Sequence, residues 1–566
     1  MVEYRKNRRF FLKIFQNGVM NLKPINAPRS DSGRFRLLAR WPSFRARPYL
    51  QQEKQHGELS ATQIGATIDL SSEEKALLQK IAANSEIDSL RVDHADWLEM
   101  NGQSVRAEFI LSNLKRTNNE SSSEGHIENI LLAIRAENLL RQYQSNWLAP
   151  WENFGIQNAH WFRGYPSKVQ ITGRAFISLG EYLLQTLPIE SVHLIAVRPL
   201  FSELIQQSHL ARLKALDLRG NHLGNLLVAQ LLKCPFLESI TELNLASNSV
   251  HPDVHSLFSH DHLHQLNKLN LETNLLGDQL VDCLNFARLQ ELNIANNRID
   301  DEVAQKIFDH PLFPNLKSIS LANNRITSRG VQRLLQREES QLERLNLSGN
   351  RFESPLIIKL KQTPILNRLR QLDLDNLNLG DEDLINLTNR GTELPLRKLS
   401  IAYNLLGDQS ATALGNSAMF TRLVELNLGH NRIGNEGLIA LGQSRWLPQL
   451  SSLNLENNRL SDNGFKRFCE SQILPITKLK LAWNPLSDPS LMAISRAPWS
   501  RSLYQLDLTG IDFGYLGAKA LIESVHLSPD CQIIIGSQTR LWPDILQMMQ
   551  SHFRYRLIQK QPNRAK

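Results

Sequence analysis

Histidines that could bind a metal ion crowd one stretch of the sequence. His251 and His255 stand four residues apart, and His260, His262 and His264 follow. Two histidines at that spacing on one helix face can hold zinc. No acidic residue completes a metal-binding motif around them, and solvent-facing loops collect such residues by chance. We therefore predict a loop here and no metal site.

Two other groups could do chemistry in isolation. The DHAD run (93–96) combines carboxylates with an imidazole, but these alternate with the buried positions of a short helix. Cys469 lies in the helical segment FKRFCES, where a buried thiol is the usual outcome. The sequence contains no Gly-rich phosphate loop, nucleophile elbow or zincin motif. It predicts a protein that is not an enzyme and that uses no cofactor.

The cysteines and apolar runs indicate the compartment. Four cysteines lie far apart without a C-x-x-C pair, which argues against a disulfide framework or a zinc site. A reducing, cytoplasmic location fits this usage. The early apolar stretch FFLKIF (10–15) is too short for a signal peptide, and no run approaches the ~20 apolar residues of a membrane span. The alternative is a secreted effector that lacks a Sec signal.

Positive charge is concentrated at the start of the chain. Residues 1–60 hold thirteen Lys/Arg and four acidic residues, whereas the whole chain has a net charge of +8. The remainder is thus nearly neutral and offers no basic face for specific nucleic-acid binding. We predict that residues 1–65 form a disordered basic arm, or reflect an early start with Met20 as the initiator. Alternatively they contact an acidic surface or act as a targeting peptide.

A repeat must position every other candidate residue. Twelve segments fit the template L-x-x-L-x-L-x-x-N-x-L at intervals of 23 to 27 residues from Leu213, for example LVELNLGHNRIG (423–434). Such a unit cannot bury its apolar face alone and must stack on its neighbours. The L-x-L core predicts a short strand, and the Asn predicts an inward amide that pairs with turn backbone. Leu377 and Ile511 replace that Asn, so we expect altered turns there.

Segments such as GNEGLIALGQS (434–444) follow the Asn with helical spacing. With a period of 26–27 residues, the chain resembles the ribonuclease-inhibitor-like class of leucine-rich repeats. The resemblance implies an α/β solenoid over residues 160–536, curved into an arc, with a parallel sheet on the concave face and helices on the convex face. We expect a degenerate first strand in VHLIAV (192–197) and a last strand in CQIIIG (531–536). Residues 537–566 should form a capping helix and tail.

A small helical module is predicted over residues 68–150. Ser71 and Glu74 form a capping-box pattern at its first helix. The segment LRVDHADWLEMNGQSVRAEFILSNL (90–114) resembles the repeat-companion domain of planctomycete and myxobacterial proteins, as does the later junction WFRGYPSKVQI (161–171). His94 stands where that family usually has Tyr. The resemblance implies a bacterial origin and a neighbouring leucine-rich array, and it implies no biochemical activity.

Aligning the repeats gives candidate binding residues. The column before the template Asn holds small or polar residues first and large rings late: Tyr403, His430 and Trp483. The nearby residues Lys398, Glu425, Lys480 and Tyr504 complete an aromatic and charged group of the kind found at interface hot spots. We predict a non-catalytic scaffold that binds a protein partner through the C-terminal third of its concave face. The alternatives are rings that merely stiffen the turns, and an effector or inhibitor-type regulator of an enzyme.

Overall fold

The computed structural model describes residues 70–119, 126–251, 261–277, 280–281, 286–337, 340–352, 355–389, 391–470, 475–536 and 542–560. All of them belong to one compact unit, residues 56–562, and only that unit is described below. The basic arm of residues 1–65, His255 and His260 lie outside the described residues.

Four helices precede the sheet: α4 (Ser72–Ala83), α5 (Asp88–Met100), α6 (Ser104–Asn119) and α7 (His126–Leu148). The Ser71 hydroxyl accepts the Glu74 N–H at 3.1 Å, so the first helix begins at the predicted cap. Gly102, with a φ of +76°, follows the end of α5 in the left-handed conformation that glycine permits. The longest of these helices, α7, lies within the helical module predicted over residues 68–150.

The strands form one sheet of 17 strands in which each pairs with the next along the chain. They are β1 (Asn158–Phe162), β2 (Tyr165–Thr172), β3 (Ser191–Ile195), β4 (Ala215–Asp217), β5 (Glu242–Asn244), β6 (Lys268–Asn270), β7 (Glu291–Asn293), β8 (Ser318–Ser320), β9 (Arg344–Asn346), β10 (Gln371–Asp373), β11 (Lys398–Ser400), β12 (Glu425–Asn427), β13 (Ser452–Asn454), β14 (Lys478–Lys480), β15 (Gln505–Asp507), β16 (Gln532–Gly536) and β17 (Leu557–Lys560). All pairings are parallel except β1–β2, a hairpin.

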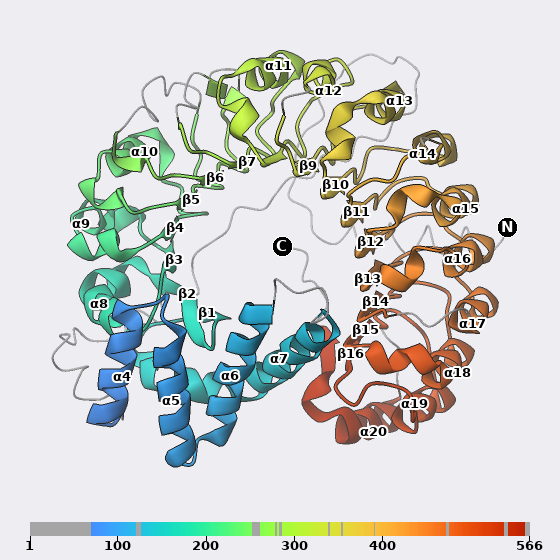
Figure 1. Ribbon diagram of the computed structural model, residues 1–566, viewed down its shortest axis with the longest axis horizontal. Helices are drawn as coiled ribbons and strands as arrows, with labels where there is room; N and C mark the ends of the chain where they lie inside the picture. The colour runs from blue at the N-terminus through green and yellow to red at the C-terminus, as the bar shows by residue number, and fades with distance from the viewer. Residues whose placement is uncertain are drawn as a thin grey trace, which may run out of the picture. The chain divides into compact units, whose positions relative to one another are not determined.

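Helices alternate with the strands: α8 (Gly173–Thr186), α9 (Phe201–Leu204), α10 (Gly224–Leu232), α11 (Asp301–Asp309), α12 (Gln332–Gln336), α13 (Pro355–Gln362), α14 (Asp381–Thr388), α15 (Asp408–Asn416), α16 (Asn435–Gly442), α17 (Asp462–Glu470), α18 (Asp488–Arg496), α19 (Tyr515–Ile522) and α20 (Pro543–Phe553). The strands line the inner side of the curve and the helices its outer side (Figure 1). This confirms the predicted α/β leucine-rich-repeat solenoid. Within the described ranges, no helix is long and apolar enough to cross a membrane.

The template positions hold the repeats together as predicted. The central leucines of adjacent strands, such as Leu399 and Leu426, face one another in register and are buried. All ten template asparagines are buried. Asn431 donates to the Ile401 and Leu428 carbonyls at 3.0 and 3.1 Å. Its oxygen accepts the Leu406 N–H at 3.2 Å, so one amide joins two repeats.

The two repeats without the template Asn keep the left-handed residue that precedes it. The residues before Leu377 and Ile511, Asn376 and Gly510, have φ of +54° and +72°, as in the other repeats. Both apolar side chains are buried in place of the amide. At Leu377 the predicted alteration was wrong: its N–H donates to the Asn404 side chain at 3.0 Å, as the template asparagines Asn248 and Asn274 do toward the next repeat. At Ile511 the hydrogen bonding is altered, because the N–H donates to the Leu508 carbonyl within the same turn at 3.1 Å.

A second ladder, on the outer side, was not predicted. Asp408, at the start of α15, accepts the Gly434 and Gly437 N–H groups of the next repeat at 2.6 and 3.0 Å. Asp381 and Asp488 bind the next repeat in the same way, at 2.8 and 2.5 Å. Each carboxylate therefore satisfies N–H groups that a helix start leaves free.

Both ends of the sheet extend further than expected. VHLIAV becomes β3, and the hairpin β1–β2 precedes it. CQIIIG becomes β16, and β17 pairs with it after the predicted capping helix α20. None of these three extra strands, β1, β2 and β17, has the repeat's leucine spacing, so the template could not reveal them.

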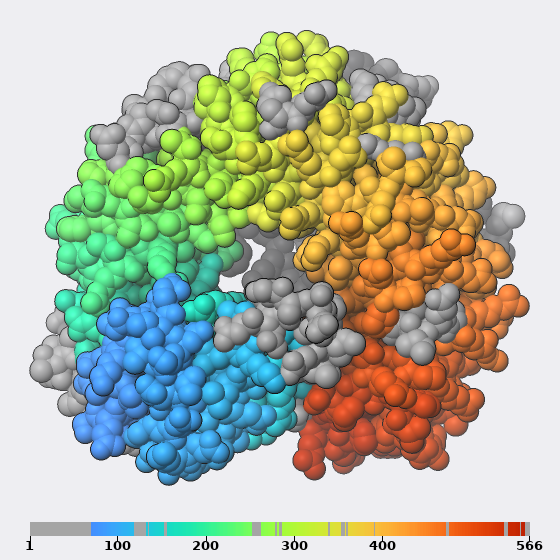
Figure 2. Space-filling model, viewed as in Figure 1, coloured from blue at the N-terminus to red at the C-terminus, as the bar shows by residue number. Residues whose placement is uncertain are grey.

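The N-terminal helices share a core with the first strands. His94 Nδ1 lies 2.7 Å from the Tyr165 hydroxyl, which joins α5 to β2. Gly164 lies so close to α6 that an added Cβ would stand 2.7 Å from the Ile110 Cα. In Figure 2 these helices and the first repeats form one continuous surface.

Candidate functional site

One column of the array has a left-handed backbone in every repeat. It is the column before the template Asn, and its φ values run from +49° to +72°. Glycine, and to a lesser degree asparagine, adopts this conformation readily, whereas other residues lose ~1–2 kcal/mol. Glycine or asparagine fills seven of the twelve positions; the others hold Ser247, Thr273, Tyr403, His430 and Trp483. The three predicted rings thus occupy positions where a ring is unfavourable.

These rings lie beside the inner face and not on it. Tyr403, His430 and Trp483 each come three residues after the end of a strand, so they follow the carboxyl edge of the sheet. We name Tyr403, His430, Asn457, Trp483 and Gly510 the C-terminal rim. This corrects the expectation that the rings lie on the concave face. The turn after the strand carries the column to the sheet's edge.

The rim has its own backbone ladder. The Tyr403 N–H donates to the Gly429 carbonyl at 3.0 Å, and the His430 N–H donates to the Glu456 carbonyl at 2.6 Å. The Trp483 N–H donates to the Thr509 carbonyl at 2.9 Å. Each ring is therefore attached to a backbone that the next repeat fixes.

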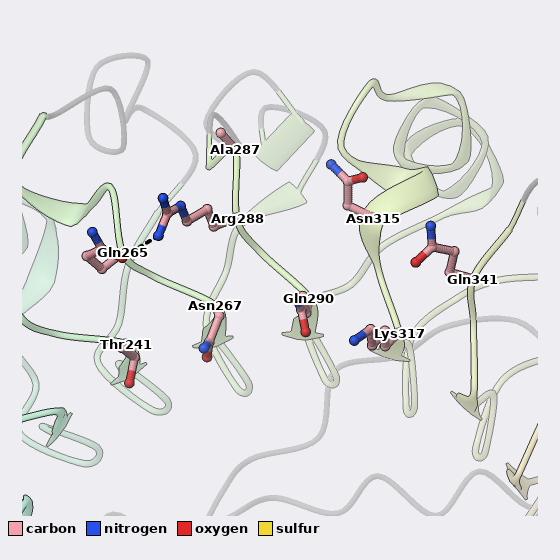
Figure 3. A pocket seen from close by; sticks show the side chains of 9 residues that line it. All are labelled: Thr241, Gln265, Asn267, Ala287, Arg288, Gln290, Asn315, Lys317 and Gln341. Atoms are coloured by element: carbon pink, nitrogen blue, oxygen red, sulfur yellow. Dashed lines mark hydrogen bonds between the residues drawn. The ribbon is translucent and has the colours of Figure 1, made fainter.

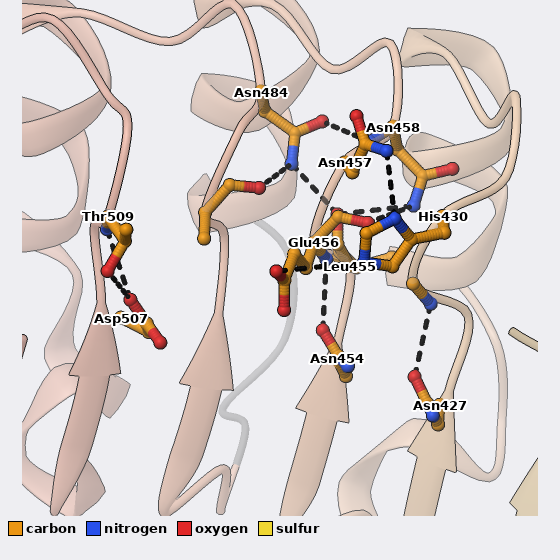
Figure 4. A network of polar contacts seen from close by, with 12 residues as sticks. Asn427, His430, Asn454, Leu455, Glu456, Asn457, Asn458, Asn484, Asp507 and Thr509 are labelled. Carbon is orange, nitrogen blue, oxygen red and sulfur yellow. Dashed lines mark hydrogen bonds and ion pairs between the residues drawn. The ribbon is translucent and has the colours of Figure 1, made fainter. Parts of the chain in front are cut away.

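Tyr403 and His430 form a stacked pair. Their ring centroids are 3.9 Å apart and their planes differ by 9°, which confirms that they are neighbours at one strand spacing. The Asn457 amide nitrogen lies 2.9 Å from His430 Nδ1, and Glu456 lies 3.7 Å from His430 Nε2. Figure 4 shows this network above the ends of the strands. His430 is thus held on three sides, whereas Tyr403 remains 58% exposed.

Trp483 lies against Gly510 in the next repeat. A Cβ on Gly510 would stand 2.5 Å from Trp483 Cε3, so only glycine leaves room for the ring. Trp483 nevertheless stays 42% exposed. The rim therefore presents two exposed rings on either side of His430 and Asn457.

The predicted charged residues lie on the strands. Lys398 Nζ and Glu425 Oε1 pair across β11 and β12 at 2.7 Å, and both side chains are about half exposed. Lys480 lies at the end of β14, beside Asp507 of β15. Asp507 is itself bound by Lys560 at 2.5 Å. These predicted residues lie on the strands that lead to the rim.

Tyr504 does not belong to an exposed surface, which corrects its place among the candidates. It is buried at 4% exposure, and its hydroxyl accepts a hydrogen bond from Gln532 at 3.1 Å. Burial and a hydrogen bond with Glu137 of α7 raise the pKa of Tyr504. Asn138 of α7 contacts Asp530 at 3.2 Å beside it. A contact between residues almost 400 positions apart leaves no trace in a local pattern.

Two carboxylates near the rim were missed. Burial raises the pKa of Asp373 to about 6, and the charge of Asp375 adds to the rise. Asp375 accepts the Ser400 hydroxyl at 2.6 Å and the Ala402 N–H at 2.7 Å. Burial raises the pKa of Asp375 as well. The sequence feature that could have revealed them is the pair of aspartates on either side of Leu374, in the repeat where Leu377 replaces the template Asn.

A polar groove of about 500 Å³ lies at the opposite edge, where β5 to β8 begin (Figure 3). It is lined by amides together with Arg288 and Lys317, and Arg288 donates to Gln265 at 2.6 Å. A second hollow of about 380 Å³ covers the inner face of β2 to β8, where Lys268 pairs with Glu242 at 2.8 Å. Both hollows are open, strand leucines line the second one together with polar residues, and neither is lined by an aromatic ring.

The cysteine and histidines considered for catalysis or metal binding are buried or paired with other residues of the fold. Burial raises the pKa of the Cys469 thiol, which keeps it protonated. His94 is buried and bonded to Tyr165. His262 pairs with Glu238 at 3.2 Å on the surface. Among the described residues, no three His, Cys, Asp or Glu side chains gather as metal ligands would.

Comparison with known protein families finds the same repeat in this chain. A family model described as "Leucine Rich repeat" matches residues 289–308, 314–335, 421–442 and 475–495. An internalin (inlF) from Listeria monocytogenes has 18% identity and a TM-score of 0.31, covering 55% of this chain and 86% of that one. The Rad7 and Elc1 complex of yeast gives 16% identity and a TM-score of 0.40, with coverage of 58% and 76%. No curated protein matches the sequence. The chain carries leucine-rich repeats, as predicted.

Proposed function

We propose that this protein is a non-catalytic scaffold that binds a protein partner at the C-terminal rim. Tyr403, His430 and Trp483 supply the contact, and Lys398, Glu425 and Lys480 border it on the strands. Leucine-rich-repeat domains commonly mediate protein binding, and stacked repeats form extended surfaces at little ordering cost.

One observation carries this proposal. Tyr403 and Trp483 combine an unfavourable backbone conformation with 58% and 42% exposure. A bulky residue at positive φ costs stability, and such strain clusters at binding sites. Large rings held rigidly at a surface give binding energy with little loss of entropy.

The alternative is that the rings stiffen their turns. His430 fits that description in part, since it stacks, accepts a hydrogen bond and lies beside Glu456. Asn457, however, adopts the same turn with a φ of +49° and without any ring. The turn thus forms without an aromatic side chain, and stiffening does not account for the exposure of Tyr403.

The test replaces the three rings with asparagine, which this column already uses elsewhere. Wild type and the variant Tyr403→Asn/His430→Asn/Trp483→Asn serve as baits for proteins of the native host, followed by mass spectrometry and titration of the purified partner. The matched control is Ser247→Asn/Thr273→Asn, in the same column near the other end. We expect the control to bind like wild type and the rim variant to lose at least tenfold in affinity.

Equal binding by a folded rim variant would refute the proposal. If the proposal holds, measuring the partner's own activity with and without this protein distinguishes a passive scaffold from the alternative function, an effector or inhibitor-type regulator. A change in that activity on binding would favour the regulator.

We also propose that α4–α7 form the repeat-companion type of module and that the repeats are of the ribonuclease-inhibitor-like class. The contacts of His94 with Tyr165 and of Ile110 with Gly164 support the first assignment, because they join the two signature segments. The helices of eight or nine residues that follow each strand from β9 to β15 support the second. Three free, buried cysteines, Cys234, Cys469 and Cys531, support a reducing, cytoplasmic location over secretion.

A further inference from the structure

The open face of Tyr403 offers a place for one more planar group. His430 covers one face of the ring at 3.9 Å. Since the two planes are nearly parallel and the residues belong to adjacent repeats, the other face is turned toward the preceding repeat, at Asn376. Among the described residues, no other aromatic ring stacks on that face and no lysine or arginine lies over it.

Two carboxylates flank the Tyr403–His430 stack, one at each end. Asp375, in the preceding repeat, accepts the N–H of Ala402, the residue before Tyr403, at 2.7 Å, and Glu456 lies 3.7 Å from His430 Nε2 at the other end. Their charges add to the effect of burial, which raises the pKa of Tyr403. In the aligned repeats, Asp375 and Glu456 are three strand spacings apart, or roughly 14 Å along the sheet. Between them the same position holds only Ala402 and Gly429, so no long side chain intervenes.

These carboxylates lack the partners that other acids of the sheet have. Glu242, Glu291 and Glu425 each pair with a lysine or arginine on a neighbouring strand. In the described part of the chain, no lysine or arginine pairs with Asp375 or Glu456. The area beside Tyr403 therefore carries negative charge without a matching lysine or arginine.

We infer that the rim binds a basic segment of its protein partner along the Tyr403–His430 stack, with one arginine or lysine over the open face of Tyr403 beside Asp375 and a second facing Glu456. This rests on the proposed function and adds the chemistry of the partner. A cation over a tyrosine ring is favoured, and arginine adds planar stacking. Nucleic acid does not fit, because its phosphates would meet these two carboxylates.

The experiment uses the purified full chain and a fluorescently labelled eight-residue peptide of alternating Arg and Ala. The matched peptide carries citrulline, the uncharged isostere, in place of each Arg. Anisotropy titrations at a physiological salt concentration should give at least tenfold tighter binding of the Arg peptide. Equal affinities, or binding of neither peptide, would overturn the inference.

Variants locate the binding to the rim. Glu456→Gln removes one charge without touching the hydrogen bonds of Asp375, and adding Asp375→Asn removes the second. We expect each step to weaken the Arg peptide about fivefold, with circular dichroism unchanged. The control Glu436→Gln, an exposed residue on α16 in an adjoining repeat, removes the same charge and should change nothing. Unchanged affinity in the Asp375→Asn/Glu456→Gln variant would overturn the inference.

The outcomes also separate this inference from the proposed function. If Tyr403→Asn/His430→Asn/Trp483→Asn loses the partner while Asp375→Asn/Glu456→Gln keeps it, the rim binds an uncharged surface and only the inference fails. If a labelled single-stranded DNA binds the rim more tightly than the Arg peptide, the inference is wrong. If the rim variant keeps its partner, both proposals fail.

Discussion

Replacing Tyr403 with asparagine separates a binding role from a structural one. Tyr403 is 58% exposed, so about two-fifths of its surface is covered. An enclosed aromatic side chain buries roughly 150–250 Å², which gives ~80 Å² here, or ~2 kcal/mol at 25 cal/mol per Å². The stack on His430 adds ~1 kcal/mol. Against this, asparagine relieves ~1–2 kcal/mol of left-handed strain and keeps part of the contact.

The net change in the free energy of unfolding should therefore be a loss of no more than about 1 kcal/mol. Urea denaturation followed by circular dichroism measures it. Leu426→Ala, at a fully buried strand position, is the contrasting variant and should lose ~2–5 kcal/mol. The affinity for the partner should fall at least tenfold, or by about 1.4 kcal/mol, in Tyr403→Asn. A stability loss above ~3 kcal/mol with unchanged affinity would refute the reasoning, because the ring would then be a structural element.

Three further predictions concern the array. Asn431→Ala leaves the buried Leu406 N–H without its acceptor, whereas the Ile401 and Leu428 carbonyls keep a second amide donor from Asn404 and Asn458; the free energy of unfolding should therefore fall by about 1–3 kcal/mol in urea denaturation. Gly510→Ala should lower the free energy of unfolding by ~1–2 kcal/mol, because alanine is unfavourable at positive φ, and should also displace Trp483 and weaken partner binding. Gly220→Ala is the control: it has the same φ of +72° but open space around it, so it should lower the free energy of unfolding without changing binding. Asp373 has a pKa raised to about 6, so its contribution is present below about pH 4 and is lost as the pH rises through 6. Between about pH 4 and 7 the wild type should therefore lose up to about 3 kcal/mol more stability than Asp373→Asn; identical pH profiles would show that burial does not perturb this carboxyl.

The architecture of the array could be predicted from the sequence because each repeat carries the same pattern of leucines and asparagine. Leu399 and Leu426 pair as the template requires, and Asn431 binds the backbone of two repeats. The stacking of Tyr403 on His430 also followed from the alignment, since one repeat corresponds to one strand spacing.

Contacts that bypass the repeat could not be predicted in this way. Tyr504 is buried because α7, from the N-terminal module, lies over it through Glu137 and Asn138. The strand β17 pairs with β16 without any leucine template. The carboxylates that bind helix starts, such as Asp408, were hidden for a different reason: acidic residues are common after loop glycines and in the first turn of any helix, so their presence does not reveal a bond to the next repeat.

The column of left-handed residues bears on the proposed binding site, because its backbone conformation does not favour aromatic side chains. Stacked repeats impose nearly the same φ on twelve residues, so the backbone cost of each side chain is comparable along the array. Glycine and asparagine minimise that cost, and at Asn376 and Asn457 the chain uses asparagine on either side of the Tyr403–His430 pair. Since the same turn forms with and without a ring, folding alone does not require one at Tyr403. Its exposure and the nearby carboxylates support the proposal that a partner binds there. If so, substitutions at the rim, and not in the hollows near β2 to β8, should weaken binding without unfolding the protein.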